Sequence, residues 1–201
     1  MTQRQNLAEE YAVEFCTRHG LRAERFIKVE LRSGKTPDFR VYRDEQLVCY
    51  CEAKHVQHDD WLDKQLEQAQ PMEIVGGVRH DPIFNRLAEH IHKAAKQFDA
   101  VNNDHEYPNV LVFANSDRHC GFADLVSTLT GNFYAEGGSI EPIFRNVSEG
   151  RIREEKLTID LYVWFNEWRP EKNWVFITES SPHYAALCFL LGSDPAKHRH
   201  V

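Results

Sequence analysis

The sequence predicts a single α/β domain, and three features of its first 116 residues support that prediction. Apolar residues recur with helical spacing over 3–19, alternate as in a β-hairpin over 38–54, and return to helical spacing over 85–102 before an apolar strand at 110–114. A chain of 201 residues, 42% of them hydrophobic, can bury one substantial core. We therefore expect one domain over 1–201, with a core of about 1–116, an insertion of about 55–84 and a C-terminal extension of about 117–201.

The expected N-terminal helix has one apolar side with acidic residues along its borders. At about 100° per residue, six apolar side chains share one arc: Leu7, Ala8, Tyr11, Ala12, Phe15 and Cys16. Gly20 follows as a residue suited to a helix C-cap. Glu9 lies at one edge of the arc, Glu10 points further outward, and Glu14 lies near the other edge. The helix dipole and solubility alone would also favour acids here.

Three strands are expected next. The stretch 26–31 predicts the first, and two extended runs joined by a polar turn at 44–46 predict a hairpin. Successive side chains of a strand point to opposite faces. On the second hairpin strand, one face carries Tyr50, Glu52 and Lys54, and the other carries Cys49, Cys51 and Ala53. Asp38 begins the first hairpin strand, so two carboxylates and an ammonium should meet on one patch.

Such a patch suits a divalent cation with a lysine beside it, a combination that serves phosphodiester hydrolysis. Glu52 and Lys54 could instead form an ordinary solvated ion pair on a surface hairpin. The run 47–51 that precedes them is unusually apolar for a surface strand, which favours the metal site.

Pro37-Asp38, followed by Glu52-Ala53-Lys54 with the two acids 14 positions apart, resembles the signature of the PD-(D/E)XK nuclease superfamily. The resemblance covers about residues 1–116, where helix, three strands, helix and strand follow in the family's order. It implies a restriction-endonuclease-like fold: a three-layer α/β/α core with a central mixed sheet, here with added C-terminal strands and a helix. It also implies a metal-dependent endonuclease that hydrolyses phosphodiester bonds, with DNA favoured as the substrate and RNA left open.

The same resemblance implies roles for the residues of the motif. Asp38 and Glu52 would be the catalytic ligands of Mg²⁺ or Mn²⁺, and the carbonyl of Ala53 would be a further oxygen ligand. Lys54 would orient or deprotonate the attacking water, or stabilise the charge that develops on the phosphate.

Two helices are expected to add further residues to this site. On the first, the run from Ala8-Glu9 to Gly20 resembles a family pattern in which a glutamate reaches the metal, so Glu9 takes that role and Glu10 is its rival. On the helix 85–102, a polar stripe flanks the apolar arc: Arg86, His90, Lys93 and Gln97. The resemblance makes Lys93 and Gln97 candidates for substrate binding, although a solvated basic face would give the same pattern.

The remaining segments predict less. The insertion 55–84 shows a short amphipathic helix after 59–60, and proline and glycine interrupt the rest, so it could be a lid or a dimer contact. Beyond residue 116 we expect a helix at 122–129, strands at 157–165 and 174–178, a terminal helix at 184–191 and a basic tail at 197–200.

Composition limits the environment and the partners. Five irregularly spaced cysteines, no apolar leader in the first residues and no run of membrane-spanning length predict a reduced, cytoplasmic protein. The net charge of −7 argues against a non-specific nucleic-acid binder, although a local basic strip can dominate near a phosphate. Because one such site cuts one strand, cleavage of both strands of DNA would call for a homodimer.

Two alternatives stay open at this point. The first is a non-catalytic nucleic-acid-binding or protein-interaction module that retains the nuclease fold, which the acidic balance favours. The second is a zinc site made of Cys49, Cys51, His55 and His58. A Cys-x-Cys pair inside an apolar strand lacks the loop of most structural zinc sites, so buried cysteines acting as small apolar residues explain the pattern better.

Overall fold

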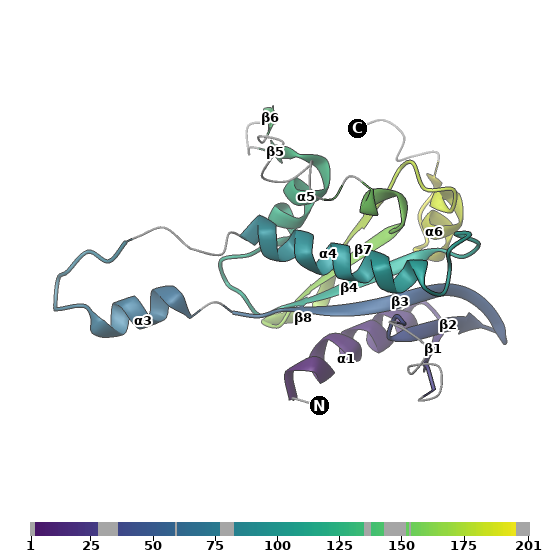
Figure 1. Ribbon diagram of the computed structural model, residues 1–201, viewed down its shortest axis with the longest axis horizontal. Helices are drawn as coiled ribbons and strands as arrows, with labels where there is room; N and C mark the ends of the chain where they lie inside the picture. The colour runs from purple at the N-terminus through teal and green to yellow at the C-terminus, as the bar shows by residue number, and fades with distance from the viewer. Residues whose placement is uncertain are drawn as a thin grey trace.

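The computed structural model describes residues 3–27, 36–58, 60–76, 83–134, 138–142, 152 and 154–195, with the backbone alone at 3–6 and 156. These residues form a mixed α/β structure around one central sheet (Figure 1). The sheet has six strands in the order β1-β2-β3-β4-β7-β8. Their bounds are Arg22–Arg25, Phe39–Arg43, Gln46–Val56, Asn109–Asn115, Leu161–Asn166 and Arg169–Ile177.

Both strand directions occur in this sheet. Strands β1, β2 and β3 are antiparallel neighbours, β3, β4 and β7 run parallel, and β8 is antiparallel to β7. All seven residues of β4 are buried, as its continuous apolar run predicts for a central strand. Strands β7 and β8 come from the segment beyond residue 116, so that segment completes the central sheet.

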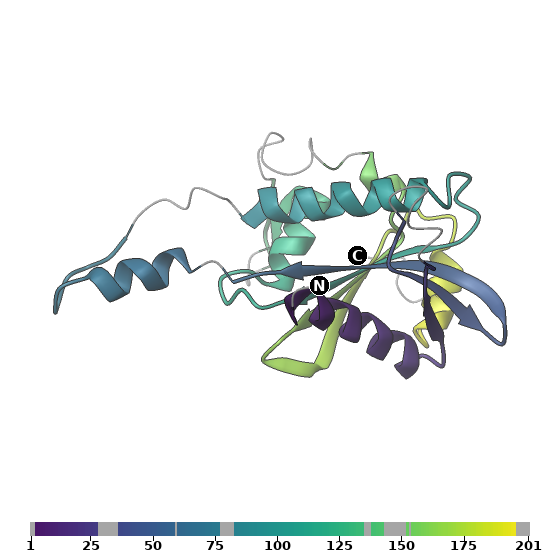
Figure 2. The same cartoon turned by 60° about the horizontal axis from the view of Figure 1, so that its bottom comes forward.

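Helices cover both faces of the sheet (Figure 2). On one face lie α1 (Gln3–Arg18) and α6 (Tyr184–Leu190), and on the other lie α4 (Ile83–Asp99) and α5 (Phe122–Thr130). The core on the α4 face includes Leu87, Ile91, Phe98, Leu111, Phe113 and Trp164. The core on the α1 face includes Tyr11, Phe15, Val110, Val112, Val163 and Leu187.

The two long helices match their sequence patterns. The predicted apolar arc of α1 packs against the sheet, and Gly20, just past the end of the helix, has the positive φ of 67° expected at a C-cap. The predicted arc of α4 supplies all six of its buried residues: Leu87, Ala88, Ile91, Ala94, Ala95 and Phe98. Hydrophobic periodicity therefore predicts both the existence and the inward face of each helix.

The edge strands correct the sequence prediction. The first strand is β1 at 22–25 and not 26–31; Phe26 is buried beyond its end, and 28–31 lie outside the described residues. Likewise β8 begins at Arg169 and not at 174. At the inner strand β7, the short 3₁₀ helix η1 (Glu155–Leu157) stands near the expected start at 157, and the strand itself begins at Leu161. An edge strand needs hydrogen bonds from one neighbour only and exposes polar side chains, so hydrophobicity predicts its bounds poorly.

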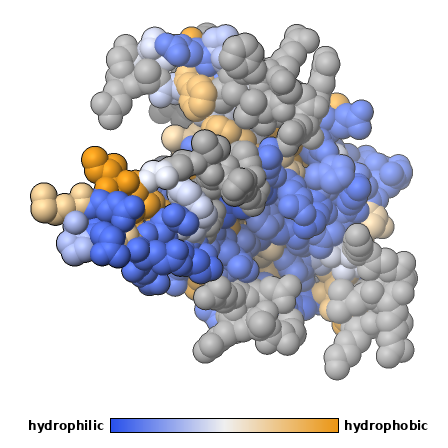
Figure 3. Space-filling model, turned by 60° about the vertical axis from the view of Figure 1, so that its left-hand side comes forward, coloured by the Kyte–Doolittle hydropathy of each residue, from blue (hydrophilic) through white to orange (hydrophobic). Residues whose placement is uncertain are grey.

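The insertion carries one helix that stands away from the body of the protein (Figure 1). Strand β3 continues to Val56, and α3 (Trp61–Gln68) then forms the expected short helix without a buried residue. The following stretch exposes Met72 and Ile74. In Figure 3 hydrophobic side chains gather at the left-hand edge, and much of the described surface beside them is hydrophilic.

The remaining described segments are short. A hairpin of β5 (Asn132–Tyr134) and β6 (Ile140–Pro142), which the sequence did not predict, follows α5, and the expected basic tail lies outside the described residues. Among the described helices, none has the length and apolar character needed to cross a membrane.

Candidate functional site

The β2–β3 hairpin brings Asp38 beside Glu52. Its turn consists of Asp44 and Glu45, both with positive φ (46° and 65°), as a tight two-residue hairpin turn requires. In the resulting register Phe39 faces Cys51, so the preceding Asp38 faces Glu52. The Asp38 N–H donates to Glu52 Oε2 at 2.9 Å, and the Ala53 N–H donates to Asp38 Oδ2 at 2.9 Å.

The predicted alternation along β3 is confirmed. Tyr50 packs in the core on the α4 face, whereas Cys49 and Cys51 pack on the α1 face. Glu52, two residues after Tyr50, is only 2% exposed, and its Oε1 accepts a hydrogen bond from the Lys54 ammonium. Glu52 therefore lies between the Asp38 backbone and the Lys54 side chain.

Helix α4 reaches this cluster through Gln97. The Lys54 ammonium donates to Gln97 Oε1 at 2.9 Å, and Gln97 Nε2 donates to the carbonyl of Thr36 at 2.9 Å. Gln97 thus links the segment just before Asp38 to the lysine at the end of the motif. Because its amide cannot ionise, it fixes the position of Lys54 without adding charge.

His90 comes from the same stripe of α4 and has a distinct environment. Its ring lies edge-on to Phe113 with the ring centroids 6.3 Å apart. Burial lowers the pKa of His90 to about 4, and the positive charges of Lys54 and Lys93 add to the effect. His90 is therefore neutral at pH 7 and adds no second positive charge to that of Lys54.

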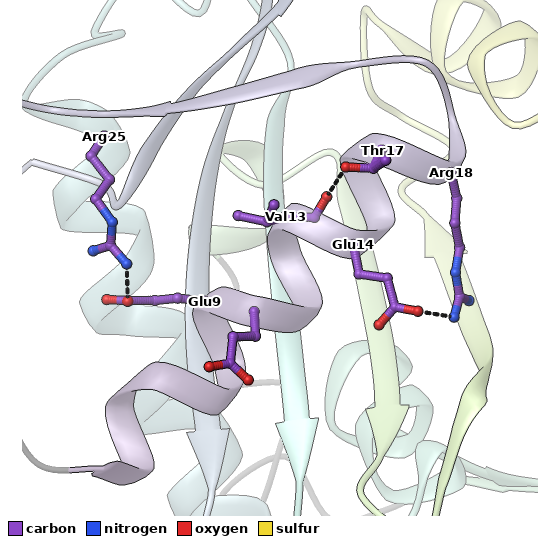
Figure 4. A pocket seen from close by; sticks show the side chains of 7 residues that line it. Glu9, Val13, Glu14, Thr17, Arg18 and Arg25 are labelled. Carbon is purple, nitrogen blue, oxygen red and sulfur yellow. Dashed lines mark hydrogen bonds and ion pairs between the residues drawn. The ribbon is translucent and has the colours of Figure 1, made fainter.

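Glu9 lies at the border of the cluster. It is 8% exposed, and its carboxylate pairs with the guanidinium of Arg25 (Figure 4). The negative charge of Glu9 also contributes to the raised pKa of Asp38. Its rival Glu10 is exposed to solvent. Glu9 is thus buried and electrostatically coupled to Asp38. Its contact with a metal stays a prediction.

The two central carboxyls are held in an environment that disfavours their charged forms. Burial raises the pKa of Asp38, while the Ala53 N–H and the Lys54 ammonium oppose that rise. Burial raises the pKa of Glu52 to about 8, the neighbouring Asp38 carboxylate adds to the rise, and Lys54 opposes it. A cation bound between the two carboxyls would favour the charged forms of both, so the pair is suited to hold one.

The donor set fits a hard divalent cation. Asp38 and Glu52 provide carboxylate oxygens from adjacent strands, and Mg²⁺ and Mn²⁺ prefer oxygen ligands. Within the described ranges, however, only His105, Asp160 and His183 bring three ligand-type side chains within 4.8 Å of one another. No third carboxylate of the described residues therefore lies that close to Asp38 and Glu52, and water would complete the coordination.

The other residues of the α4 stripe differ in their placement. Arg86 pairs with Asp117 at 2.5 Å. The side chain of Lys93 is 58% exposed and pairs with Glu89 on the helix surface. The structure thus brings Gln97 to the motif and leaves Lys93 at the surface, where binding of a substrate by it stays a prediction.

The structure does not assemble the alternative zinc site. All five cysteines are buried, and burial raises the pKa of the Cys49 thiol well above its usual value. No three of Cys49, Cys51, His55 and His58, all of them described, come within the 4.8 Å that a shared ion would require. The cysteines act as small apolar core residues, as the sequence suggested.

Sequence reasoning missed Arg25 and the second polar cluster of His105, Asp160 and His183. Arg25 ends an edge strand that the sequence misplaced, so no sequence pattern predicted its ion pair with Glu9. The three members of the cluster are 55 and 23 positions apart, too far for any local pattern to relate them. His90 was in the predicted stripe, but its lowered pKa follows from burial in the packed structure, which the stripe alone did not predict.

Comparisons with known proteins give no assignment, because no family model, no curated protein and no solved structure matches the chain. The function therefore has to be argued from the residues and their geometry.

Proposed function

We propose that this protein is a metal-dependent nuclease of the PD-(D/E)XK type that hydrolyses phosphodiester bonds, with DNA as the favoured substrate. The observation that carries the proposal is the buried cluster in which Asp38, Glu52 and Lys54 meet at the β2–β3 hairpin. A restriction-endonuclease-like arrangement of the fold forms part of the same proposal, and the mixed sheet with helices on both faces is consistent with it.

The energetic argument is that this cluster lowers the stability of the metal-free fold, so its presence points to a function and not to a structural role. Placing two carboxyls together in a buried site raises their pKa values, which means that their charged forms are destabilised. A buried ion pair such as Glu52–Lys54 is also weak evidence for stability, since desolvation offsets its attraction. Perturbed acids beside an oriented lysine are typical of a site that binds a cation and performs chemistry.

Each residue has a role in this mechanism. Asp38 and Glu52, with the Ala53 carbonyl, would hold Mg²⁺ or Mn²⁺, which when bound supplies a Lewis acid for the scissile phosphate and its attacking water. The Lys54 ammonium, held by Glu52 and Gln97, is a positioned proton donor and positive charge for the phosphate oxygens. Gln97 keeps that ammonium in place through its link to Thr36.

The acidic net charge of −7 restricts how the substrate can bind. Contacts spread over a broad basic surface would require a different composition, so binding must rest on the cation and on a few local positive groups. Lys93 is the proposed residue for this contact, whereas Gln97 holds Lys54 in place. A homodimer would place two sites on the two strands of a duplex.

A cleavage assay tests the proposal. The panel holds single-stranded, duplex and branched DNA together with RNA, each with Mn²⁺ and with a chelator. We expect cleavage of at least one DNA by the wild type with Mn²⁺, and its loss in Asp38→Ala and in Lys54→Ala while circular dichroism shows an intact fold. Lys96→Ala, an exposed lysine of the same helix as Gln97, is the matched control and should cut normally.

Two results would oppose the proposal. Equal cleavage by the wild type, Asp38→Ala and Lys54→Ala would show that another site, or a contaminant, does the chemistry. No cleavage, together with a thermal stability that ignores Mg²⁺ and Mn²⁺ and a Glu52→Gln variant that behaves as wild type, would support the non-catalytic module instead.

A further inference from the structure

A second polar cluster lies outside the proposed nuclease site, where three segments of the chain meet. His105 comes from the loop between α4 and β4, Asp160 stands immediately before β7, and His183 immediately before α6. One ligand-type atom from each residue lies within 4.8 Å of the others. The cluster therefore joins elements that are distant in the sequence.

Asp160 is the fixed centre of this cluster. It is 1% exposed, and its two oxygens accept three hydrogen bonds. The Asn109 N–H donates to Oδ2 at 2.7 Å, His105 Nε2 donates to Oδ2 at 2.8 Å, and Ser181 Oγ donates to Oδ1 at 2.5 Å. Carboxylates that bind metals are held in this way by outer hydrogen bonds, which orient their remaining lone pairs.

Both histidines are also held in position. His183 Nε2 donates to the carbonyl of His105 at 3.0 Å, which leaves Nδ1 of His183 with a free lone pair in that tautomer. The backbone N–H of His105 donates to the carbonyl of Asn102 at 2.9 Å, and the φ angle of His105, 51°, lies in the left-handed region. A ring nitrogen that donates to a main-chain carbonyl while the other faces an ion is a recurring arrangement of metal-binding histidines.

We infer that His105, Asp160 and His183 form a binding site for a transition-metal ion, with Zn²⁺ as the best-suited ion. Two imidazole nitrogens and one carboxylate oxygen are donors that Zn²⁺ accepts, whereas Mg²⁺ prefers oxygen alone. The ion takes the place of the proton that His105 shares with Asp160. Water occupies the fourth position of the tetrahedron.

The geometry permits this with small movements. Zinc bonds of about 2.0–2.2 Å in a tetrahedron place ligand atoms about 3.3 Å apart. The ligand atoms, already within 4.8 Å of one another, would move by about 1.5 Å at most. Both histidine side chains are only partly buried, so the ion reaches the site from solvent.

The bound ion would act as a structural cross-link. It would connect the α4–β4 loop, the start of β7 and the start of α6, and α6 otherwise packs through few buried residues, Leu187 and Cys188. An ion that binds the folded chain more tightly than the unfolded chain raises stability by mass action. This site uses none of the residues proposed for cleavage, so each proposal can fail without the other.

The test is a Zn²⁺ titration of the purified, chelator-treated chain by calorimetry, with Co²⁺ absorption as a report on tetrahedral coordination. The wild type should bind one Zn²⁺ with a rise in melting temperature, and excess Mg²⁺ should leave that ion bound. His105→Gln and His183→Gln should each weaken binding by at least about 10-fold, since losing a ligand costs more than losing an outer partner. His92→Gln, an exposed histidine paired with Glu155, is the matched control.

Three outcomes overturn the inference. The wild type could take up no Zn²⁺, which would leave the cluster as a hydrogen-bonded triad. Both His105→Gln and His183→Gln could bind Zn²⁺ as tightly as the wild type. Finally, Glu52→Gln could abolish the binding while His105→Gln keeps it, which would place the ion at the carboxylates of the hairpin. Circular dichroism of each variant separates a lost ligand from a lost fold.

Discussion

The cluster around Asp160 and the cluster around Glu52 place their buried carboxyl groups in opposite surroundings. Asp160 accepts hydrogen bonds from a backbone N–H, a hydroxyl and an imidazole, and among the described residues no second carboxylate joins its cluster. Glu52 accepts from a backbone N–H and from Lys54, and it faces the carboxylate of Asp38. The first acid is satisfied by its neighbours, and the second is left with a repulsive partner.

This difference indicates which kind of metal ion each cluster is suited to bind. The Asp160 cluster offers nitrogen donors and an orienting network, which suits a structural transition-metal ion. The Glu52 cluster offers two carboxyl groups as oxygen donors and one oriented ammonium, which suits Mg²⁺ or Mn²⁺ and a phosphate. Substitutions in one cluster, with control substitutions in the other, test whether the two clusters have these separate functions.

The largest expected effect is on cleavage. Lys54→Met removes the ammonium that Glu52 and Gln97 hold, and it should lower the cleavage rate by at least about 100-fold, the usual contribution of a positioned proton-transfer group. The rate is measured on the best DNA of the panel with saturating Mn²⁺. His105→Gln serves as the control from the other cluster, and a comparable loss in that variant would contradict the separate functions of the two clusters.

The second effect concerns positioning. Gln97→Leu keeps the size of the side chain but removes both hydrogen bonds, to Lys54 and to Thr36. We expect kcat to fall by about 10-fold, as for the loss of an outer partner of a metal site, with little change in KM. A rise in KM at constant kcat would instead assign Gln97 to substrate binding, the role that the sequence resemblance gave it.

The smallest effect is on stability. In the metal-free protein, folded Glu52 keeps its proton up to about pH 8, whereas the unfolded chain loses it near 4.5. The folded state therefore binds more protons over that window, and stability falls as pH rises. His90 acts in the opposite direction between about pH 4 and 6.5, because only its unfolded form is protonated there. Glu52 is thus the dominant of these two between pH 6.5 and 8.

Thermal melts in a chelator measure this slope. The melting temperature of the wild type should fall between pH 6.5 and 8, and Glu52→Gln should remove that fall and melt at least about 3 °C higher at pH 8. Glu9→Gln, at the border of the same cluster, should keep most of the slope. An unchanged slope in Glu52→Gln would show that the burial of this carboxyl does not control the stability.

Much of the site was predictable because it depends on local patterns. The alternation of side chains on β3 put Glu52 and Lys54 on one face, and helical periodicity put Gln97 on the border of α4. These patterns act over two to four residues, so the sequence displays them directly. The burial of Glu52 and the contact of Gln97 with Thr36 required the packed structure.

Other features had no local signal. The edge strands β1 and β8 contain polar residues whose extended form depends on pairing with a neighbour. The sequence misplaced β1 and missed the first part of β8, residues 169–173. Arg25 reaches Glu9 only because β1 lies where it does. His105, Asp160 and His183 meet because three chain segments converge, which no spacing in the sequence could reveal.

Direct measurement of Mn²⁺ binding tests the central claim, that Asp38 and Glu52 form a divalent-cation site. Electron paramagnetic resonance of free Mn²⁺ can be followed during titration of the wild type, Glu52→Gln and His105→Gln. We predict that the wild type and His105→Gln bind Mn²⁺ alike and that Glu52→Gln binds it at least about 10-fold more weakly. Equal Mn²⁺ binding by Glu52→Gln and the wild type would contradict the account.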